Sequence, residues 1–158
     1  TSSDKLAAVG TSAGGITIGR AFTEKPNLFK TAVIRVGALN ALRSENSKNT
    51  FTVTEFGTSK DSLEFQYLLE MDVYHHLKDG VKYPSVYFTA GLNDHRVAAW
   101  EPVKVVAKMQ KLDKNNIVLF KVTDQGHFSA GDPATNLGET YAFLFWQLGH
   151  PDFKYIKK

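Results

Sequence analysis

The chain has 158 residues, of which 42% are hydrophobic and 22% charged, a composition that suits one globular domain with a moderate core. The absence of cysteine excludes disulfides, a thiol nucleophile and thiolate metal ligands but fits reducing and oxidising compartments equally, so no localisation is predicted. The net charge of +3 matches a lysine excess at the C-terminus, so we predict no nucleic-acid binding. Neither an apolar run of about 18 residues nor a signal-peptide pattern occurs, so we predict no membrane binding.

Strand-like and helix-like segments alternate along the chain. Residues 5–9 form a short apolar run, which predicts a strand, and residues 13–23 follow a helical pattern that Pro26 ends. Residues 31–36 are β-branched and almost continuously apolar, which is typical of a strand buried on both faces of a parallel sheet. Gly37 ends this second strand.

The periodicity fails between residues 38 and 58, where Asn, Ser and Thr are frequent, and we predict a loop that runs over the surface. Beyond it the alternation resumes. Helices are predicted over residues 62–71, 98–112 and 136–148, and strands over residues 85–90 and 117–122. About four strands joined by helical crossovers predict an α/β fold with a mostly parallel sheet flanked by helices.

The junction of the first strand and helix has the spacing of a nucleophile elbow. Its residues are Gly10-Thr11-Ser12-Ala13-Gly14-Gly15. A serine at the tip of a sharp strand-to-helix turn leaves little room two residues to either side, which glycine provides. The amide of Ala13 would then face the charge that develops on a substrate oxygen. The alternative is a glycine-rich turn with an incidental serine, because such short matches also arise by chance.

Two more polar residues follow predicted strands at the same edge of the sheet. Asp94 comes after the strand over residues 85–90, and His127 comes after the last strand. Taken singly, Asp94 could be a turn residue and His127 a loop histidine bonded to backbone. Their order with Ser12 is nonetheless that of the α/β-hydrolase triad, and three coincident placements favour a Ser-Asp-His catalytic triad.

The remaining histidines do not suggest a metal site. His75 and His76 are adjacent, and neighbours on one element point in different directions, with no further ligands at helical or turn spacing. His95 and His150 are predicted to lie on the surface. We therefore predict no metal and no cofactor.

Five short motifs along the chain form one pattern: the nucleophile segment, Glu55-Phe56-Gly57, Tyr83-Pro84, Asp94-His95-Arg96-Val97 and Gly126-His127. With these motifs the chain resembles the C-terminal part of the catalytic domain of the prolyl oligopeptidase family of serine peptidases, a partial α/β-hydrolase fold. The resemblance implies that Arg96 binds a carbonyl of the substrate peptide, that Val97 lines the specificity pocket, and that Phe56 belongs to the substrate-binding site. A guanidinium has several donors in a fixed fork, which suits that role. The residues alone leave open an Arg96 that pairs with Glu101 or Asp94.

The chain also departs from the family pattern. Members that select proline are known for a tryptophan and a tyrosine in the middle loop, where this chain has Thr52 and Phe56 by approximate register. Strict proline preference is therefore not expected. Residues 1–158 are expected to form the C-terminal portion of the catalytic domain, without the first strands, the β-propeller or the upstream tyrosine of the family's oxyanion hole. Ala13 would be the remaining oxyanion donor.

Two hypotheses of function follow. In the first, the chain is a serine peptidase that hydrolyses oligopeptides through Ser12, Asp94, His127 and an acyl-enzyme. In the second, it is an inactive half-domain fragment that associates with another chain. Residues 6–9 have no charge and would become an exposed sheet edge, so we expect a homo-oligomer or a part of a longer chain.

Overall fold

The computed structural model describes residues 1–128 and 132–154 and contains a four-stranded, fully parallel sheet. The strands lie in the order β1-β2-β3-β4, which is also their order in the chain. Their bounds are β1 Ala7–Thr11, β2 Thr31–Arg35, β3 Ser85–Gly91 and β4 Val118–Thr123. The predicted α/β sheet of about four strands is confirmed.

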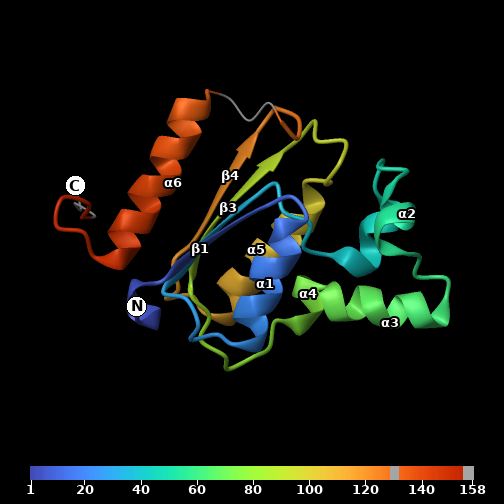
Figure 1. Ribbon diagram of the computed structural model, residues 1–158, viewed down its shortest axis with the longest axis horizontal. Coiled ribbons are helices and arrows are strands. Elements are labelled where there is room, and N and C mark those ends of the chain that lie inside the picture. The colour runs from blue at the N-terminus through green and yellow to red at the C-terminus, as the bar shows by residue number, and fades with distance from the viewer. Residues whose placement is uncertain (129–131, 155–158) are drawn as a thin grey trace.

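Helices cover both faces of this sheet, so the fold has three layers (Figure 1). On one face lie α1 (Gly14–Glu24) and α5 (Trp100–Leu112), and on the other lies α6 (Pro133–Leu148). The short α4 (Val73–His76) packs against α1 and α5, whereas α2 (Thr52–Phe56) and α3 (Ser62–Met71) extend to one side. Two 3₁₀ helices, Ser3–Lys5 and Ala41–Asn46, complete the elements. Within the described ranges, no helix has both the length and the apolar character that a membrane crossing requires.

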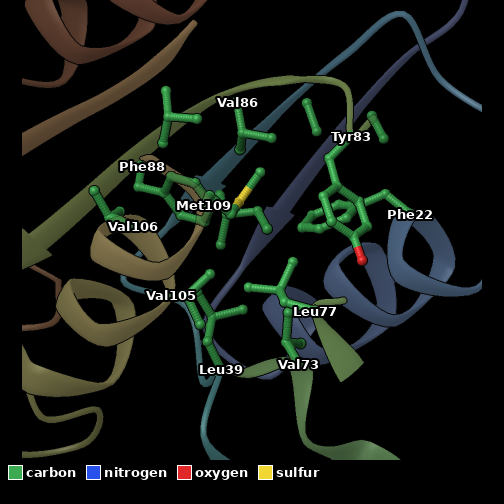
Figure 2. Packing of buried hydrophobic residues seen from close by; sticks show 14 residues of the cluster. Phe22, Leu39, Val73, Leu77, Tyr83, Val86, Phe88, Val105, Val106 and Met109 are labelled. Carbon is green, nitrogen blue, oxygen red and sulfur yellow. The ribbon is translucent and has the colours of Figure 1, made fainter. Parts of the chain in front are cut away.

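The core is split between the two faces because successive strand residues point to opposite sides. Toward α1 and α5, Ile34 and Phe88 pack with Phe22 and Met109, and Figure 2 shows Phe88 beside Met109 and the valines of α5. Toward α6, Val33 and Tyr87 pack against Phe143 and Leu144. The central strand β2 is therefore buried on both faces, as its continuous apolar pattern predicts.

Local signals set several helix ends. The carboxylate of Asp61 accepts hydrogen bonds from the amides of Leu63 and Glu64 at the start of α3. Asp132 caps α6 in the same way, so this helix begins at Pro133, three residues before the predicted start at 136. Gly149 ends α6 in the left-handed conformation, with φ 79°.

The segment after β2 corrects the prediction of a surface loop over residues 38–58. Ala38, Leu39, Asn40, Ala41 and Leu42 are all buried, and Leu39 and Asn40 are fully so. The segment lacks periodicity because it turns through a 3₁₀ helix, and its buried polar groups have remote partners that sequence spacing does not reveal. The second half, around α2, is mostly exposed as expected.

Strand β1 lies at an edge of the sheet. Among the described strands it pairs only with β2, and its apolar Val9 is 45% exposed. Its other edge therefore presents unpaired backbone groups, the arrangement that favours pairing with a further strand.

The contact between β1 and α1 requires glycine at position 10. A Cβ at Gly10 would lie 2.5 Å from the carbonyl oxygen of Gly14 and 2.9 Å from Cγ1 of Ile18. A Cβ at Gly14, by contrast, would meet nothing within 4 Å. Of the two glycines that flank Ser12, only Gly10 is therefore required for steric reasons. The sequence alone predicts this requirement on both sides of the serine.

We predict that Gly10→Ala lowers the free energy of unfolding by about 1–3 kcal/mol, because a backbone oxygen cannot move aside without shifting the turn. The matched control is Gly138→Ala in α6, where the new Cβ meets nothing within 4 Å. That change should instead stabilise the protein by roughly 0.5–1 kcal/mol through helix propensity. Urea denaturation followed by tryptophan fluorescence measures both, and equal effects of the two variants would contradict the close approach.

Candidate active site

Three side chains meet at the carboxyl edge of the sheet. Ser12 follows β1, Asp94 follows β3, and His127 follows β4. Nε2 of His127 lies 2.9 Å from Oγ of Ser12, and Nδ1 of His127 lies 2.7 Å from Oδ2 of Asp94. The side chains of His127 and Asp94 are 5% and 0% exposed, so this hydrogen-bonded chain is shielded from water. A hydroxyl, an imidazole and a carboxylate hydrogen-bonded in this order have the geometry expected of a catalytic triad.

The backbone of Ser12 is strained. Its φ of 57° lies in the left-handed region, which residues with a side chain seldom adopt. Three hydrogen bonds hold it there: the amide of Ser12 donates to the carbonyl of Arg35 at 2.9 Å, and the carbonyl of Ser12 accepts from Gly15 at 2.8 Å and Ala38 at 3.0 Å. The strained conformation is retained because hydrogen bonds hold it from two sides, from Arg35 and Ala38 on one and from Gly15 on the other.

Asp94 is both a turn residue and the partner of His127. One carboxylate oxygen, Oδ1, accepts from the amides of Arg96 at 2.8 Å and Val97 at 2.9 Å. The other, Oδ2, contacts His127. The turn interpretation and the triad interpretation of Asp94 are therefore compatible, since the turn fixes the direction of the second oxygen.

A small pocket opens beside Ser12. It is lined by Ser12, Ala13, Ala38, Asn49, Glu55, Phe56, Arg96 and Val97. All four residues that the sequence suggests for oxyanion and substrate binding, Ala13, Phe56, Arg96 and Val97, thus lie on one pocket. Sequence reasoning missed Ala38 and Asn49, and only the polar character of residues 38–58 hinted at them.

The amide of Ala13 is available to a ligand. It makes no hydrogen bond within the described part of the chain, and it immediately precedes the first residue of α1. Helix N-termini have unpaired amides and a partial positive charge, which favour a negatively charged ligand atom. The position therefore fits an oxyanion donor next to Ser12.

Arg96 is exposed and forms no ion pair with a described residue, so neither Glu101 nor Asp94 neutralises it. Its backbone carbonyl accepts from Nδ2 of Asn49 at 3.1 Å. Its guanidinium lies over the ring of Phe128, 5.7 Å from the centroid, and that ring meets His127 edge-on at 4.8 Å. Phe128 is 85% exposed and was not recognised in the sequence, where a residue next to the base has no distinguishing pattern.

A second buried carboxylate lies near the site. Glu101 in α5 is 2% exposed, and burial raises the pKa of its carboxyl to about 7. The amides of Asn40 and Leu39 oppose this rise by donating hydrogen bonds, whereas the negative charges of Asp72 and Asp94 add to it. Sequence reasoning considered Glu101 only as a partner of Arg96, a pairing that the structure does not contain.

No group of three or more potential metal ligands is assembled within residues 1–128 and 132–154. Of the adjacent histidines, His75 contacts Oδ1 of Asp72 through Nδ1 at 2.9 Å, and His76 contacts the carbonyl oxygen of Asp72 at 2.7 Å. Both therefore pack around the start of α4. His95 and His150 are exposed, as predicted.

The family model of the prolyl oligopeptidase family matches residues 1–151. The chain belongs to this family. Among curated relatives, it is 32% identical to Protease 2 of Moraxella lacunata and 35% identical to the prolyl endopeptidase of Elizabethkingia miricola. These alignments cover 94% and 98% of this chain but only 23% of each relative.

Solved structures of the prolyl oligopeptidase family have the same fold in the matched region. Oligopeptidase B from Leishmania major superposes with a TM-score of 0.83 at 30% identity, covering 94% of this chain and 22% of that one. A prolyl endopeptidase superposes with a TM-score of 0.86 at 28% identity, covering 98% and 23%. The four-stranded sheet is thus part of an α/β-hydrolase fold, and the chain spans about a quarter of the length of the relatives it matches.

The raised pKa of Glu101 predicts a pH-dependent stability. A carboxyl with a pKa of 4.5 when unfolded and about 7 when folded stabilises the fold below pH 4.5, and this contribution is lost as the pH rises to 7. Glu101→Gln stays neutral, so its free energy of unfolding relative to wild type should increase over this range, by on the order of 3 kcal/mol. Urea denaturation at pH 4.5 and pH 8 measures the difference.

The control for the loss of one negative charge is Glu24→Gln, at an exposed position in the last turn of α1. If the free energies of unfolding of Glu101→Gln and wild type differ by the same amount at both pH values, the raised pKa of Glu101 is contradicted.

Proposed function

We propose that this chain is the C-terminal part of a serine peptidase catalytic domain that hydrolyses peptide bonds of oligopeptides through an acyl-enzyme. The observation that supports this most directly is the hydrogen-bonded series from Ser12 through His127 to Asp94. Family membership supports the same reaction class, since relatives are named prolyl endopeptidase and Protease 2.

In the proposed reaction, Nε2 of His127 removes the proton of Ser12 while Oγ attacks the substrate carbonyl carbon. Asp94 holds the ring by accepting from Nδ1 and stabilises the imidazolium that forms. The carbonyl oxygen becomes an oxyanion near the amide of Ala13. As the tetrahedral intermediate collapses, His127 gives its proton to the leaving amine, and an acyl-enzyme on Ser12 remains. Water, deprotonated by His127, then hydrolyses this ester and regenerates the serine hydroxyl.

We assign substrate binding to the pocket beside Ser12. The guanidinium of Arg96 would donate to a peptide carbonyl, with its backbone held by Asn49. Val97 and Phe56 would contact the side chain next to the scissile bond, and both line the pocket. By approximate register, Thr52 occupies the position where proline-selective members have tryptophan. We therefore do not propose strict proline preference.

We also propose that residues 1–158 work together with further strands, supplied by a longer chain or by a second chain. The open edge of β1 and the coverage of only 23% of the relatives support this. The same observations favour a second candidate function, in which the isolated piece is inactive and acts only by association. The two candidates differ in whether the chain alone acylates Ser12.

A fluorophosphonate probe distinguishes them. We expect it to label Ser12 covalently in the wild-type chain, and we expect no labelling of Ser12→Ala and at least a hundredfold slower labelling of His127→Ala, because the hydroxyl loses its base. Mass spectrometry of the labelled peptide identifies the site, and circular dichroism verifies that each variant is folded. A folded but unlabelled wild-type chain would favour the fragment hypothesis.

The role of Arg96 has its own test. Arg96→Ala should reduce kcat/KM for an oligopeptide by about tenfold to a hundredfold, the value of a hydrogen bond to a charged donor. A small activated ester, which has no neighbouring peptide carbonyl, should be less affected. Arg43→Ala, at an exposed arginine in the 3₁₀ helix Ala41–Asn46, is the control. Equal losses on both substrates would exclude Arg96 from peptide binding.

A further inference from the structure

The proposed reaction leaves one buried ionisable group without a role. Glu101 lies in the first turn of α5, is 2% exposed and forms no ion pair with any described residue. Its Oε2 accepts two hydrogen bonds from successive backbone amides, those of Leu39 at 3.2 Å and Asn40 at 3.3 Å. A buried carboxylate is costly unless something compensates, so a buried group of this kind is a candidate for a functional role.

The side chain of Asn40 anchors the same segment further. Its Nδ2 donates to Oδ2 of Asp72 at 2.6 Å, and its Oδ1 accepts from Nζ of Lys104. Asp72 also accepts from the amide of Leu42 at 3.0 Å. Residues 39–42 are therefore fixed from α5 on one side and from the start of α4 on the other.

This anchored segment continues directly from the backbone that holds Ser12. The amide of Ala38 donates to the carbonyl of Ser12, and a Cβ at Gly15 would lie 2.8 Å from Cα of Gly37. Just before them, Val36 has a φ of 42°, an unfavourable conformation for a β-branched residue. The amide of Val36 donates to the carbonyl of Thr89, which secures the strained turn before residue 37. Glu101 secures it after residue 38.

We propose that Glu101 is a positioning residue for the nucleophile: its ionised carboxylate binds the two amides that follow the strained turn and, through Ala38, fixes the backbone of Ser12. We call these two hydrogen bonds of Glu101 to Leu39 and Asn40 the clamp. The catalytic consequence of the clamp rests on the proposed function, whereas the clamp itself is a feature of the fold. An anion is suited to the task because successive amides that point to one spot form an anion-binding concavity. A neutral carboxyl or amide oxygen is a weaker acceptor for the same donors.

Several titratable and charged groups surround this clamp. Asp72 precedes α4, Asp94 follows β3, and Lys104 lies three residues further along α5. His75 of α4 contacts Asp72. Because burial raises the pKa of Glu101 to about 7, the clamp should weaken as the pH falls through neutrality.

The first test compares activity with stability at pH 8. Glu101→Gln has nearly the same shape and cannot ionise, so we expect fluorophosphonate labelling of Ser12 to slow about tenfold through a misplaced nucleophile. The melting temperature should rise, because a buried charge is removed. Glu24→Gln should change neither quantity. An unchanged labelling rate, or a labelling rate and a melting temperature that fall together, would overturn the proposal in favour of a purely structural role.

The second test does not require activity. In His127→Ala, which lacks the triad histidine, the backbone amide NMR signals of Leu39 and Asn40 should shift with pH around a midpoint of about 7, in line with the pKa of Glu101. The same transition should reach Gly15 and Ala38, the two donors to the carbonyl of Ser12. Adding Glu101→Gln should abolish it at all four amides.

Two results would overturn the clamp. A transition that survives Glu101→Gln does not arise from Glu101, and one confined to Leu39 and Asn40 does not extend to the backbone of Ser12. If the wild-type chain is not labelled at all, the isolated chain is inactive, as in the fragment hypothesis, and the NMR shifts still decide whether Glu101 positions the Ser12 backbone.

Discussion

The left-handed backbone of Ser12 is the constraint on which the site depends. A residue with a side chain occupies that conformation at a cost of about 1–2 kcal/mol, and only a rigid environment maintains it. Here β2 and the segment after it provide that environment, since Arg35 accepts from the amide of Ser12 and Ala38 donates to its carbonyl. The close packing of Gly10 against Gly14 then sets the angle at which α1 leaves the strand. The backbone neighbours of Ser12 thus fix the direction of its Cα–Cβ bond, and the contact with Nε2 of His127 adds to this at the hydroxyl.

Two carboxylates near this turn show how environment separates similar groups. Asp94 contacts a histidine with one oxygen and accepts hydrogen bonds from two backbone amides with the other. Glu101 accepts two longer hydrogen bonds and forms no ion pair with a described residue, and burial raises the pKa of its carboxyl to about 7. The same fold therefore places one carboxylate against a histidine and buries another, whose pKa is raised as a result.

Much of this architecture follows from local sequence. The apolar runs identify all four strands, because a strand such as β2 that is buried on both faces must be apolar throughout. Parallel strands in turn bring Ser12, Asp94 and His127 to one edge, so the approach of these residues follows from topology alone. The segment around Asn40 could not be predicted, because its burial depends on Asp72 and Lys104, which lie 32 and 64 residues away. Phe128 likewise acquires meaning only through the positions of His127 and Arg96.

The position of the elbow at the edge of the sheet adds a further constraint. Every described hydrogen bond to the backbone of Ser12 comes from β2, from the segment after it or from α1, whereas the opposite edge of β1 is open. A strand that is paired on one side has one row of hydrogen bonds to resist bending. The segment of residues 35–40 must therefore supply most of the rigidity that the strained serine needs. Glu101 links that segment by hydrogen bonds to the buried end of α5, where Val105 and Met109 are almost fully buried, and so connects the turn at Ser12 to the hydrophobic core.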